Sequence, residues 1–377
     1  VADLAPAIGS LALEPWVAAV PSQEVTTFDY GHFGLFPMVP EPTMTNGGAF
    51  DWVGSSPTEI FEWALTQDRE MVAQINHPRH IPTPATMQNF FSVLDLWYDD
   101  DGWYIGPEAS DPPGSGLPPD PVMFGPGFTA MEVMTWLNIQ GLSDWFNLLS
   151  AGYRFTATAN SDTHTCNVEG SGWPRNFVYV GYDEPADLDV AGFVAAVNRG
   201  QLSGSFGPLV TMEAEPEAGG DPVMQGGTLL NDGQPVRVRV RIQAAPWVQP
   251  DTLTLYMDGE VVAIEPLTLA EVDGASGGTR LEQTVEVVVD APDDTWVAAV
   301  VTGDTSLFPY VPFHQTNPDE LTLQRLRDGD VDNPATPFGY ANPVFIDADA
   351  DGAIIPSHHV MPADYDDYRQ ENRLDPY

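Results

Sequence analysis

Histidines and carboxylates recur where short apolar runs of this sequence end. The histidines are His32, His77 and His164, and the carboxylates Glu24 and Asp162 occupy similar positions. Imidazole and carboxylate groups without thiolates form a ligand set suited to Zn, Mn or Fe. A carboxylate can bridge two cations, and two cations about 3.5–4 Å apart can activate a shared water. These residue types therefore predict hydrolytic metal chemistry, provided that the fold brings them together.

Each of these residues also has a purely structural interpretation. A single histidine on a strand is more often a buried, hydrogen-bonded residue than a ligand, and a glutamate at the start of a strand is usually solvated. The run Asn160-Ser161-Asp162 is also typical of a turn that caps a helix. Recurrence at strand ends favours metal binding, but spacing alone leaves both interpretations open.

The charge balance of the chain excludes several classes of function. The 377 residues include 55 acidic and 13 basic side chains, a net charge of −42, and every basic residue is arginine. Without lysine, a Walker-A phosphate-binding loop and a Schiff-base enzyme are both excluded. A field this negative repels nucleic acids and anionic lipids, so neither is expected as a partner.

Other features bear on the location of the protein. A single cysteine, Cys166, excludes an internal disulfide framework. No apolar run approaches the roughly 18–20 residues that a membrane span requires. The chain begins with Val1-Ala2-Asp3 and no methionine, which is typical of a processed terminus or of a piece cut from a longer chain. The cysteine count does not settle the compartment, but the acidity and the apparent processing favour a secreted or cell-surface protein.

The first half of the chain alternates strand and helix signals. A helix is expected from Pro57, because Ser56 can cap it and Glu59 places a negative charge in its first turn. A second helix is expected over 142–151 and a long loop over 99–127. Strands are expected at 22–27, 31–36, 71–76, 131–134 and 155–160. Alternation of this kind favours an α/β barrel or sheet, with function at the carboxyl ends of the strands.

The second half is typical of an all-β domain. Residues 236–242 alternate with a period of two, as a half-exposed strand does. Asp258-Gly259 separates two apolar runs and predicts a hairpin. Further strands at 281–289 and 296–301 complete the pattern of a β-sandwich. We therefore expect a first domain over 1–208, a β-sandwich over 209–356 and an acidic tail over 357–377.

An ordered set of motifs resembles the PHP (polymerase and histidinol phosphatase) superfamily, and above all its CehA/McbA-type metallohydrolases, which include carbaryl hydrolase. The motifs are Glu24-Val25-Thr26-Thr27, Gly31-His32-Phe33, Asn76-His77-Pro78-Arg79, Asn160-Ser161-Asp162-Thr163-His164, Gly172-Trp173-Pro174-Arg175-Asn176 and Ser205-Phe206-Gly207-Pro208. The resemblance implies the C-terminal part of a distorted (β/α)7 barrel, which holds up to three metal ions at its mouth, followed by the β-sandwich.

The resemblance also implies roles for individual residues. Glu24 matches a carboxylate that bridges the first and second metals, and His32 and His77 match the other ligands of the second. Asp162 matches a ligand of the first metal and His164 a ligand of the third. A metal-bound hydroxide would then attack phosphorus or an acyl carbon, with the cations stabilising the developing oxyanion.

Two arginines complete the catalytic residues that the resemblance implies. Arg79 and Arg175 are candidates for binding an anionic group of the substrate, although surface or structural pairing explains either equally well. The expected activity is that of a metal-dependent phosphoesterase using zinc, manganese or iron. The alternative activity is hydrolysis of a carboxylic ester or a carbamate by the same residues.

The chain departs from the family in one respect. Family members open with a His-x-His strand, followed later by an Asp-His pair, and neither pattern occurs here. The missing strands would come from a separate chain or an upstream segment, or the site has been abandoned. In the last case the chain is a non-catalytic secreted surface or assembly protein, with a degenerate PHP barrel that binds cations.

A further acidic run has the oxygen spacing of a calcium loop. It is Asp347-Ala348-Asp349-Ala350-Asp351-Gly352. Position twelve of such a loop is His358 rather than glutamate, so a complete EF-hand is excluded. A calcium ion held by Asp347, Asp349 and Asp351 and a solvated acidic turn are the two interpretations.

Overall fold

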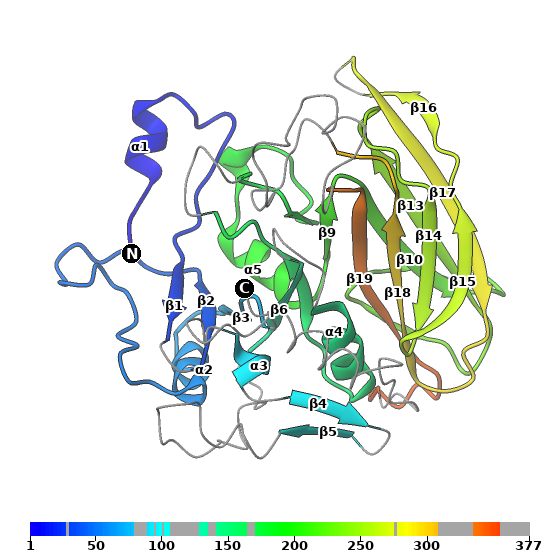
Figure 1. Ribbon diagram of the computed structural model, residues 1–377, viewed down its shortest axis with the longest axis horizontal. Helices are drawn as coiled ribbons and strands as arrows, with labels where there is room; N and C mark the ends of the chain where they lie inside the picture. Colours follow the sequence, from blue (N-terminus) through cyan, green and yellow to red (C-terminus); the bar gives the residue numbers. More distant parts are fainter. Residues whose placement is uncertain are drawn as a thin grey trace, which may run out of the picture. The chain divides into compact units, whose positions relative to one another are not determined.

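A computed structural model describes most of the chain (Figure 1). The described residues are 1–27, 30–78, 89–93, 96–99, 102–105, 128–134, 141–163, 170–274, 277–307 and 335–354. They form two compact units: the first contains Val1–Glu132 and Val178–Arg199, and the second contains Val133–Phe177 and the described residues from Gly200 onward. Among these described residues, no helix combines the length and apolar character needed to cross a membrane.

The first unit is built on a mixed sheet. Its strands are β1 (Gln23–Thr26), β2 (His32–Phe36), β3 (Val72–Ile75) and β6 (Ala130–Met134), hydrogen-bonded in that order. The pairs β1–β2 and β2–β3 are antiparallel, and β3–β6 is parallel. Sequence analysis predicted these four strands to within one or two residues.

The two faces of this sheet differ in polarity because the strands alternate. Val25, Phe33 and Ile75 stand side by side in the register and are fully buried. The Phe33 ring packs edge-on against Phe61 and Phe90, with ring centroids 5.4 Å apart in both pairs. The opposite face carries Glu24, His32, Gln74 and Asn76, so polar groups gather on that face.

Helices cover parts of this sheet. In α2 (Pro57–Leu65) the expected cap is confirmed: Ser56 and the Glu59 side chain form a capping box. The other helices of the unit are α1 (Ala5–Ser10), α3 (Phe90–Val93) and α5 (Val190–Asn198). The described part of the expected loop over 99–127 contains β5 (Gly102–Ile105), paired with β4 (Leu96–Asp99), and residues 106–127 lie outside the described residues.

The predicted (β/α)7 barrel is wrong. Parallel neighbours need a crossover of about a dozen or more residues, whereas only residues 27–31 separate β1 from β2. These strands therefore form an antiparallel hairpin, and β3 pairs with the edge of β2 that faces away from β1. No closed parallel barrel is seen among the described residues. The sequence pattern showed where the strands lie but not that they run in opposite directions.

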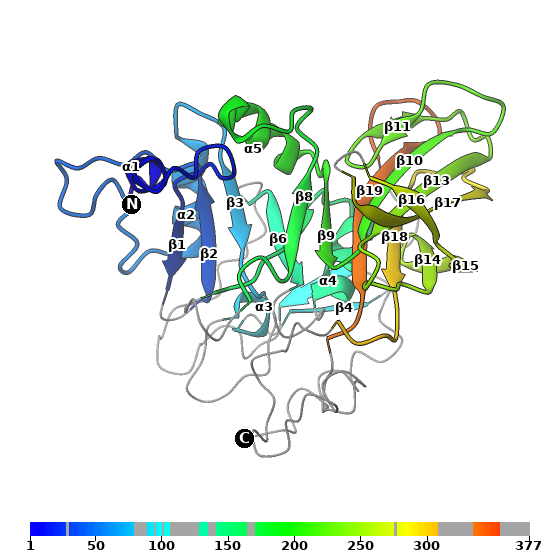
Figure 2. The ribbon, with the colours of Figure 1, turned by 90° about the horizontal axis from the view of Figure 1, so that it is seen from above.

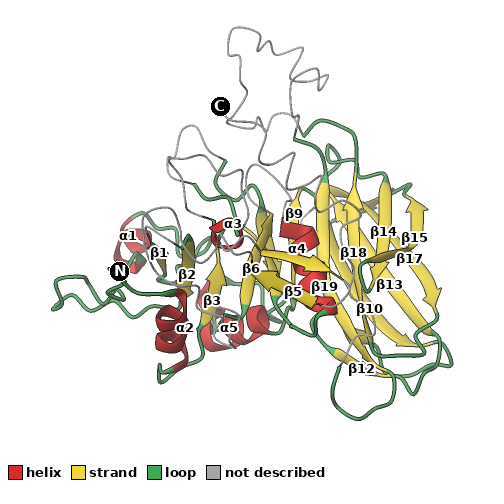
Figure 3. Cartoon of the chain, turned by 60° about the horizontal axis from the view of Figure 1, so that its bottom comes forward, coloured by secondary structure: helices red, strands yellow, loops and turns green. Residues whose placement is uncertain are grey.

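The second unit consists mainly of two sheets (Figures 2 and 3). The first has the order β11 (Val223–Met224), β10 (Leu209–Pro216), β13 (Val236–Ala244), β17 (Thr279–Val289) and β16 (Ala270–Asp273). The second has the order β15 (Glu260–Pro266), β14 (Thr252–Met257), β18 (Thr295–Thr302), β19 (Phe338–Asp347), β9 (Leu202–Phe206) and β8 (Arg175–Val178), with β12 (Thr228–Leu230) beside β19. The unit also contains α4 (Gly141–Ser150) and β7 (Thr156–Ala159), both predicted.

The two sheets bury one apolar core between them. The predicted alternation of β13 is confirmed, since Val238 and Val240 are fully buried while Arg239 on the other face pairs with Glu213 and Glu286. The predicted hairpin at Asp258-Gly259 is also confirmed, because β14 and β15 flank it. The acidic tail over 357–377 lies outside the described residues.

Candidate metal centre

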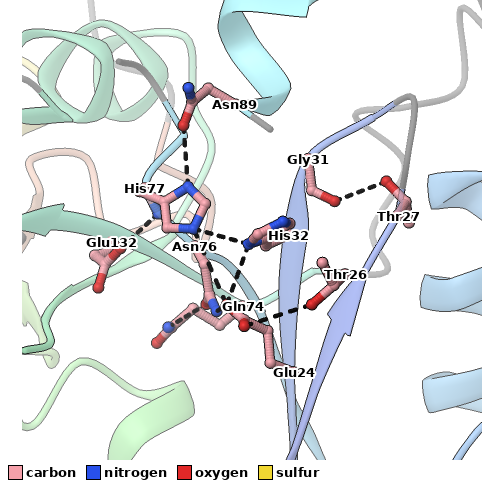
Figure 4. Close-up of polar contacts among 10 residues, drawn as sticks. All are labelled: Glu24, Thr26, Thr27, Gly31, His32, Gln74, Asn76, His77, Asn89 and Glu132. Carbon is pink, nitrogen blue, oxygen red and sulfur yellow. Dashed lines mark hydrogen bonds and ion pairs between the residues drawn. The ribbon is translucent and has the colours of Figure 1, made fainter. Parts of the chain in front are cut away.

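Three side chains of the first unit meet at one point (Figure 4). His77 Nε2 lies 3.1 Å from His32 Nδ1. Glu24 Oε1 lies 3.5 Å from His32 Nδ1 and 4.0 Å from His77 Nε2. Two imidazole nitrogens and one carboxylate oxygen thus form a compact triangle of donor atoms.

The strand pairing explains why these groups converge. In the β1–β2 hairpin Thr26 lies opposite His32 and Glu24 opposite Gly34, so Glu24 and His32 are diagonal neighbours on one face. The next strand is held in register by the Asn76 N–H, which donates to the His32 carbonyl at 3.0 Å. That bond brings the end of β3, and His77 after it, beside the hairpin.

His77 is oriented by two groups from other parts of the unit. Its backbone has φ of +27°, and its N–H donates to Glu132 Oε2 at 2.5 Å. The His77 Nδ1 lies 3.0 Å from Asn89 Oδ1. Since that oxygen is an acceptor, Nδ1 carries the proton and Nε2 keeps its lone pair, directed at Glu24 and His32. This is the tautomer that a metal ligand requires.

Glu24 is held in its ionised form. Burial alone would raise its pKa, but hydrogen bonds with His32 and Asn76 and the Coulombic effect of the two nearby imidazoles outweigh burial and lower the pKa to about 2. The Asn76 amide donates to Glu24 Oε1 at 2.9 Å and accepts from Gln74 at 2.7 Å. The carboxylate is therefore a fixed anion over the whole neutral range.

Gly34 makes room for the hydrogen-bonded side-chain amides of Gln74 and Asn76. It lies opposite both Glu24 and Gln74 in the sheet. A Cβ atom on Gly34 would lie 3.1 Å from Asn76 Oδ1, closer than a side-chain carbon normally approaches. The absence of a side chain at this strand position thus allows Asn76 to reach the carboxylate.

The triangle has the dimensions of a metal site. Ligands bound 2.0–2.1 Å from a tetrahedral zinc ion lie roughly 3.3 Å apart, and the three separations here run from 3.1 to 4.0 Å. The side chains of His32 and His77 are 11% and 15% exposed, whereas that of Glu24 is 35% exposed. Two histidines and one glutamate leave a coordination position for water, as catalytic zinc sites do.

One ring nitrogen of this group is unusual. His32 Nε2 is buried and has no hydrogen-bond partner among the described residues. Buried polar atoms are normally paired, and metal-bound histidines usually donate their second N–H to a neighbour. The orientation of the His32 ring is therefore set by packing and by its Nδ1 contacts with Glu24 and His77.

The remaining predicted site residues have different outcomes. Asp162 lies in the second unit, after β7, with φ of +45°. Arg175 also lies there, and its guanidinium is 4.6 Å from the Trp173 ring centroid and 5.4 Å from that of Phe177. Burial lowers the Arg175 pKa. Predicted residues outside the described part of the chain are Arg79 and His164.

Sequence analysis missed the residues that support the ligands. Asn76 stood in a quoted motif without a role, whereas Asn89 and Glu132 were not considered as part of the site. Glu132 did leave a signal, because a carboxylate inside the apolar run 130–134 must find a partner when buried. Asn89 lies in no motif that the sequence reveals.

Comparisons of the whole chain with protein-family models, with curated proteins and with solved structures gave no match. The likeness to the PHP superfamily therefore remains a prediction based on the ordered motifs.

Proposed function

We propose that this chain is a metal-dependent hydrolase in which Glu24, His32 and His77 hold one divalent cation. The observation that supports the proposal most strongly is the triangle of donor atoms at 3.1–4.0 Å, partly open to solvent at Glu24. The donor set is that of zinc, manganese or iron sites. It is also the subset of the PHP-like ligands that the described residues bring together.

Each residue of the site would have a distinct role in binding the ion. A divalent ion bound here would supply Lewis acidity and lower the pKa of a water molecule. Glu24, anionic at neutral pH, would offset the charge of the ion, and Asn76 would fix the carboxylate oxygen that faces it. Asn89 and Glu132 would hold the His77 ring and backbone in the ligating position.

The substrate class rests on the resemblance rather than on the site. A phosphoester is the first choice, because a cation beside a fixed carboxylate can stabilise the charge that develops on phosphoryl oxygens. A carboxylic ester or an aryl carbamate is the second, since the same chemistry serves a tetrahedral oxyanion. The non-catalytic surface or assembly protein is the competing proposal, and the experiment below distinguishes it.

The first test is metal content per chain, measured by mass spectrometry after purification without added metal. We expect about one zinc, manganese or iron ion per chain, lost in Glu24→Ala and in His77→Ala. Glu62→Ala is the matched control, because Glu62 is an exposed glutamate of α2 in the same unit. Thermal melting of all variants shows whether the unit remains folded.

The second test is hydrolysis by the metal-loaded chain. The substrates are p-nitrophenyl phosphate, p-nitrophenyl acetate and an aryl N-methylcarbamate, and activity should vanish in the variants that lose the metal. Metal bound by Glu24, His32 and His77 without turnover of any substrate would favour the non-catalytic cation binder. Absence of zinc, manganese and iron from the wild-type chain would refute the hydrolase proposal and favour the surface or assembly protein.

A further inference from the structure

A second cluster of carboxylates lies at one end of the β-sandwich, in the second unit. It consists of Asp294, which precedes β18, Asp347, the last residue of β19, and Asp349 in the loop that follows. One carboxylate oxygen of each residue lies within 4.8 Å of an oxygen of the other two. The cluster is separate in sequence and in chemistry from the histidine site.

The strand register explains why Asp294 belongs to this cluster. β18 and β19 are neighbours in one sheet (Figure 1). They are antiparallel, and Thr295 lies opposite Ile346. Continuing that register by one residue places Asp294 opposite Asp347. Like charges directly opposite one another destabilise a strand pair, so this arrangement needs a compensating positive charge.

Asp347 lacks the hydrogen bonds that a buried carboxylate requires. Its exposed fraction is 0%. Its Oδ2 accepts from the Gly352 N–H at 2.9 Å, whereas its Oδ1 is buried and has no hydrogen-bond partner among the described residues. Buried charged groups are normally paired or bound to a metal ion. The Asp347 carboxylate lies beside those of Asp294 and Asp349, so a cation bound among the three would give the unpaired Asp347 oxygen a partner.

Arg154, an arginine near Asp347 in the described part of the chain, does not neutralise this cluster. Burial lowers the pKa of Arg154, and the charge of Asp347 opposes that lowering. However, the Arg154 guanidinium stacks 4.4 Å from the Phe345 ring centroid and donates to Thr228. One arginine also leaves an excess of negative charge beside three carboxylates.

The other contacts of the cluster shape a loop around it. Asp294 Oδ1 accepts from the Ala348 N–H at 2.9 Å, and Asp349 Oδ1 accepts from the Asp351 N–H at 3.1 Å. Ala350 adopts φ of +57° and Gly352 φ of +88°, which fold the loop back. Asp349 is exposed and gives an ion access from solvent.

We propose that Asp294, Asp347 and Asp349 bind a calcium ion that ties the start of β18 to the end of β19. Ca²⁺ takes oxygen ligands at 2.3–2.6 Å, so two of its ligands can be up to roughly 4.6–5.2 Å apart, and the separations here stay within 4.8 Å. Calcium also tolerates irregular geometry, which suits ligands from two separate segments, and backbone carbonyls or waters complete its shell.

This site differs from the one that the sequence pattern predicts. The acidic run suggested Asp347, Asp349 and Asp351, but the cluster contains Asp294 in place of Asp351. Asp351 Oδ1 instead accepts from the Ala353 N–H at 2.7 Å. Since Asp294 lies far from the run in the sequence, the ion would join two strands rather than a single loop.

The test measures binding of Ca²⁺ alone to the metal-stripped full chain by isothermal titration calorimetry. We expect one site whose affinity falls at least tenfold in Asp294→Asn and in Asp349→Asn. Asp351→Asn removes the same charge from the same loop and should change the affinity less than twofold. Glu24→Ala should leave calcium binding unchanged, which separates this proposal from the hydrolase proposal.

A second readout is thermal unfolding with and without the ion. A hundredfold excess over Kd should raise the midpoint of wild type by about 5–10 °C, and Asp294→Asn should lose most of that shift. Equal binding in wild type and Asp294→Asn would overturn the proposal. It would also be overturned if Asp351→Asn lost binding while Asp294→Asn retained it, or if Mg²⁺ bound more tightly than Ca²⁺.

Discussion

Asn89→Ala tests whether the proposed metal site depends on a residue outside the three proposed ligands. Asn89 is 3% exposed, and its Oδ1 is the acceptor 3.0 Å from His77 Nδ1. Without it, the Nδ1–H loses its partner in a side chain that is only 15% exposed, which costs about 1–3 kcal/mol. The imidazole also becomes free to place its proton on Nε2, where it blocks ligation.

The expected result is a metal Kd that rises about 10–100-fold, equivalent to about 1.4–2.8 kcal/mol. The assay is a competition titration of the metal-stripped chain with zinc against a chromophoric chelator at neutral pH. Asn89→Asp restores an acceptor at the same place and should keep Kd within about threefold of wild type. That restoration separates loss of the hydrogen bond from loss of packing.

Asn198→Ala provides a matched control for this experiment. Asn198 also belongs to the first unit, where its amide donates to Glu70 Oε1 at 2.8 Å and to the Met71 carbonyl at 3.1 Å. Its loss should reduce thermal stability without changing the zinc Kd. An unchanged zinc Kd in a folded Asn89→Ala chain would refute the argument that Asn89 sets the tautomer of His77.

Further predictions concern glycine, charge and pH. Gly34→Ala should displace Asn76 by a few tenths of an ångström and weaken zinc binding about three- to tenfold in the same titration. Gly278→Ala is the control and should leave zinc binding unchanged, because Gly278 lies in open space and has no left-handed φ. Hydrogen bonds with Arg241 and Arg280 lower the pKa of Glu282 from 4.5 to about 2. Its ion pairs thus stabilise the fold above about pH 4.5 and lose their effect as the pH falls towards 2. Glu282→Gln should therefore lower the unfolding free energy by about 1 kcal/mol at pH 7, and the difference should shrink in urea titrations between pH 4.5 and 2.

The Arg–Glu pairs on β13 show how far a local pattern can predict structure. The alternation of valine and arginine over 236–242 predicted one buried and one exposed face, and both are present. Arg239 on the exposed face meets Glu213 on one neighbouring strand and Glu286 on the other. The identity of those neighbours depends on the strand order, which no periodicity within β13 contains.

The candidate metal site likewise has residues that the sequence predicts and residues that it does not. His32, His77 and Glu24 could be selected from the sequence because their side chains are the usual metal ligands and lie at strand ends. Their support by Asn89 and Glu132 could not be predicted. Glu132 lies beside His77 because β6 pairs with β3, and Asn89 contacts His77 from outside any recognised motif. In the proposed calcium site, Asp294 was missed because the pairing of β18 with β19, and not the local sequence, brings it beside Asp347.

The sequence by itself determined several local features of this protein: the positions of β1, β2, β3, β6 and β7, the Ser56 cap of α2, the hairpin at Asp258-Gly259 and the ligand chemistry available. These depend on side-chain preferences that act over a few residues. Only the tertiary structure decided that β1 and β2 run antiparallel rather than as barrel strands, and which distant carboxylates and amides meet. Strand pairing and register are set by burying whole faces against one another, so they join residues between which the sequence shows no relation.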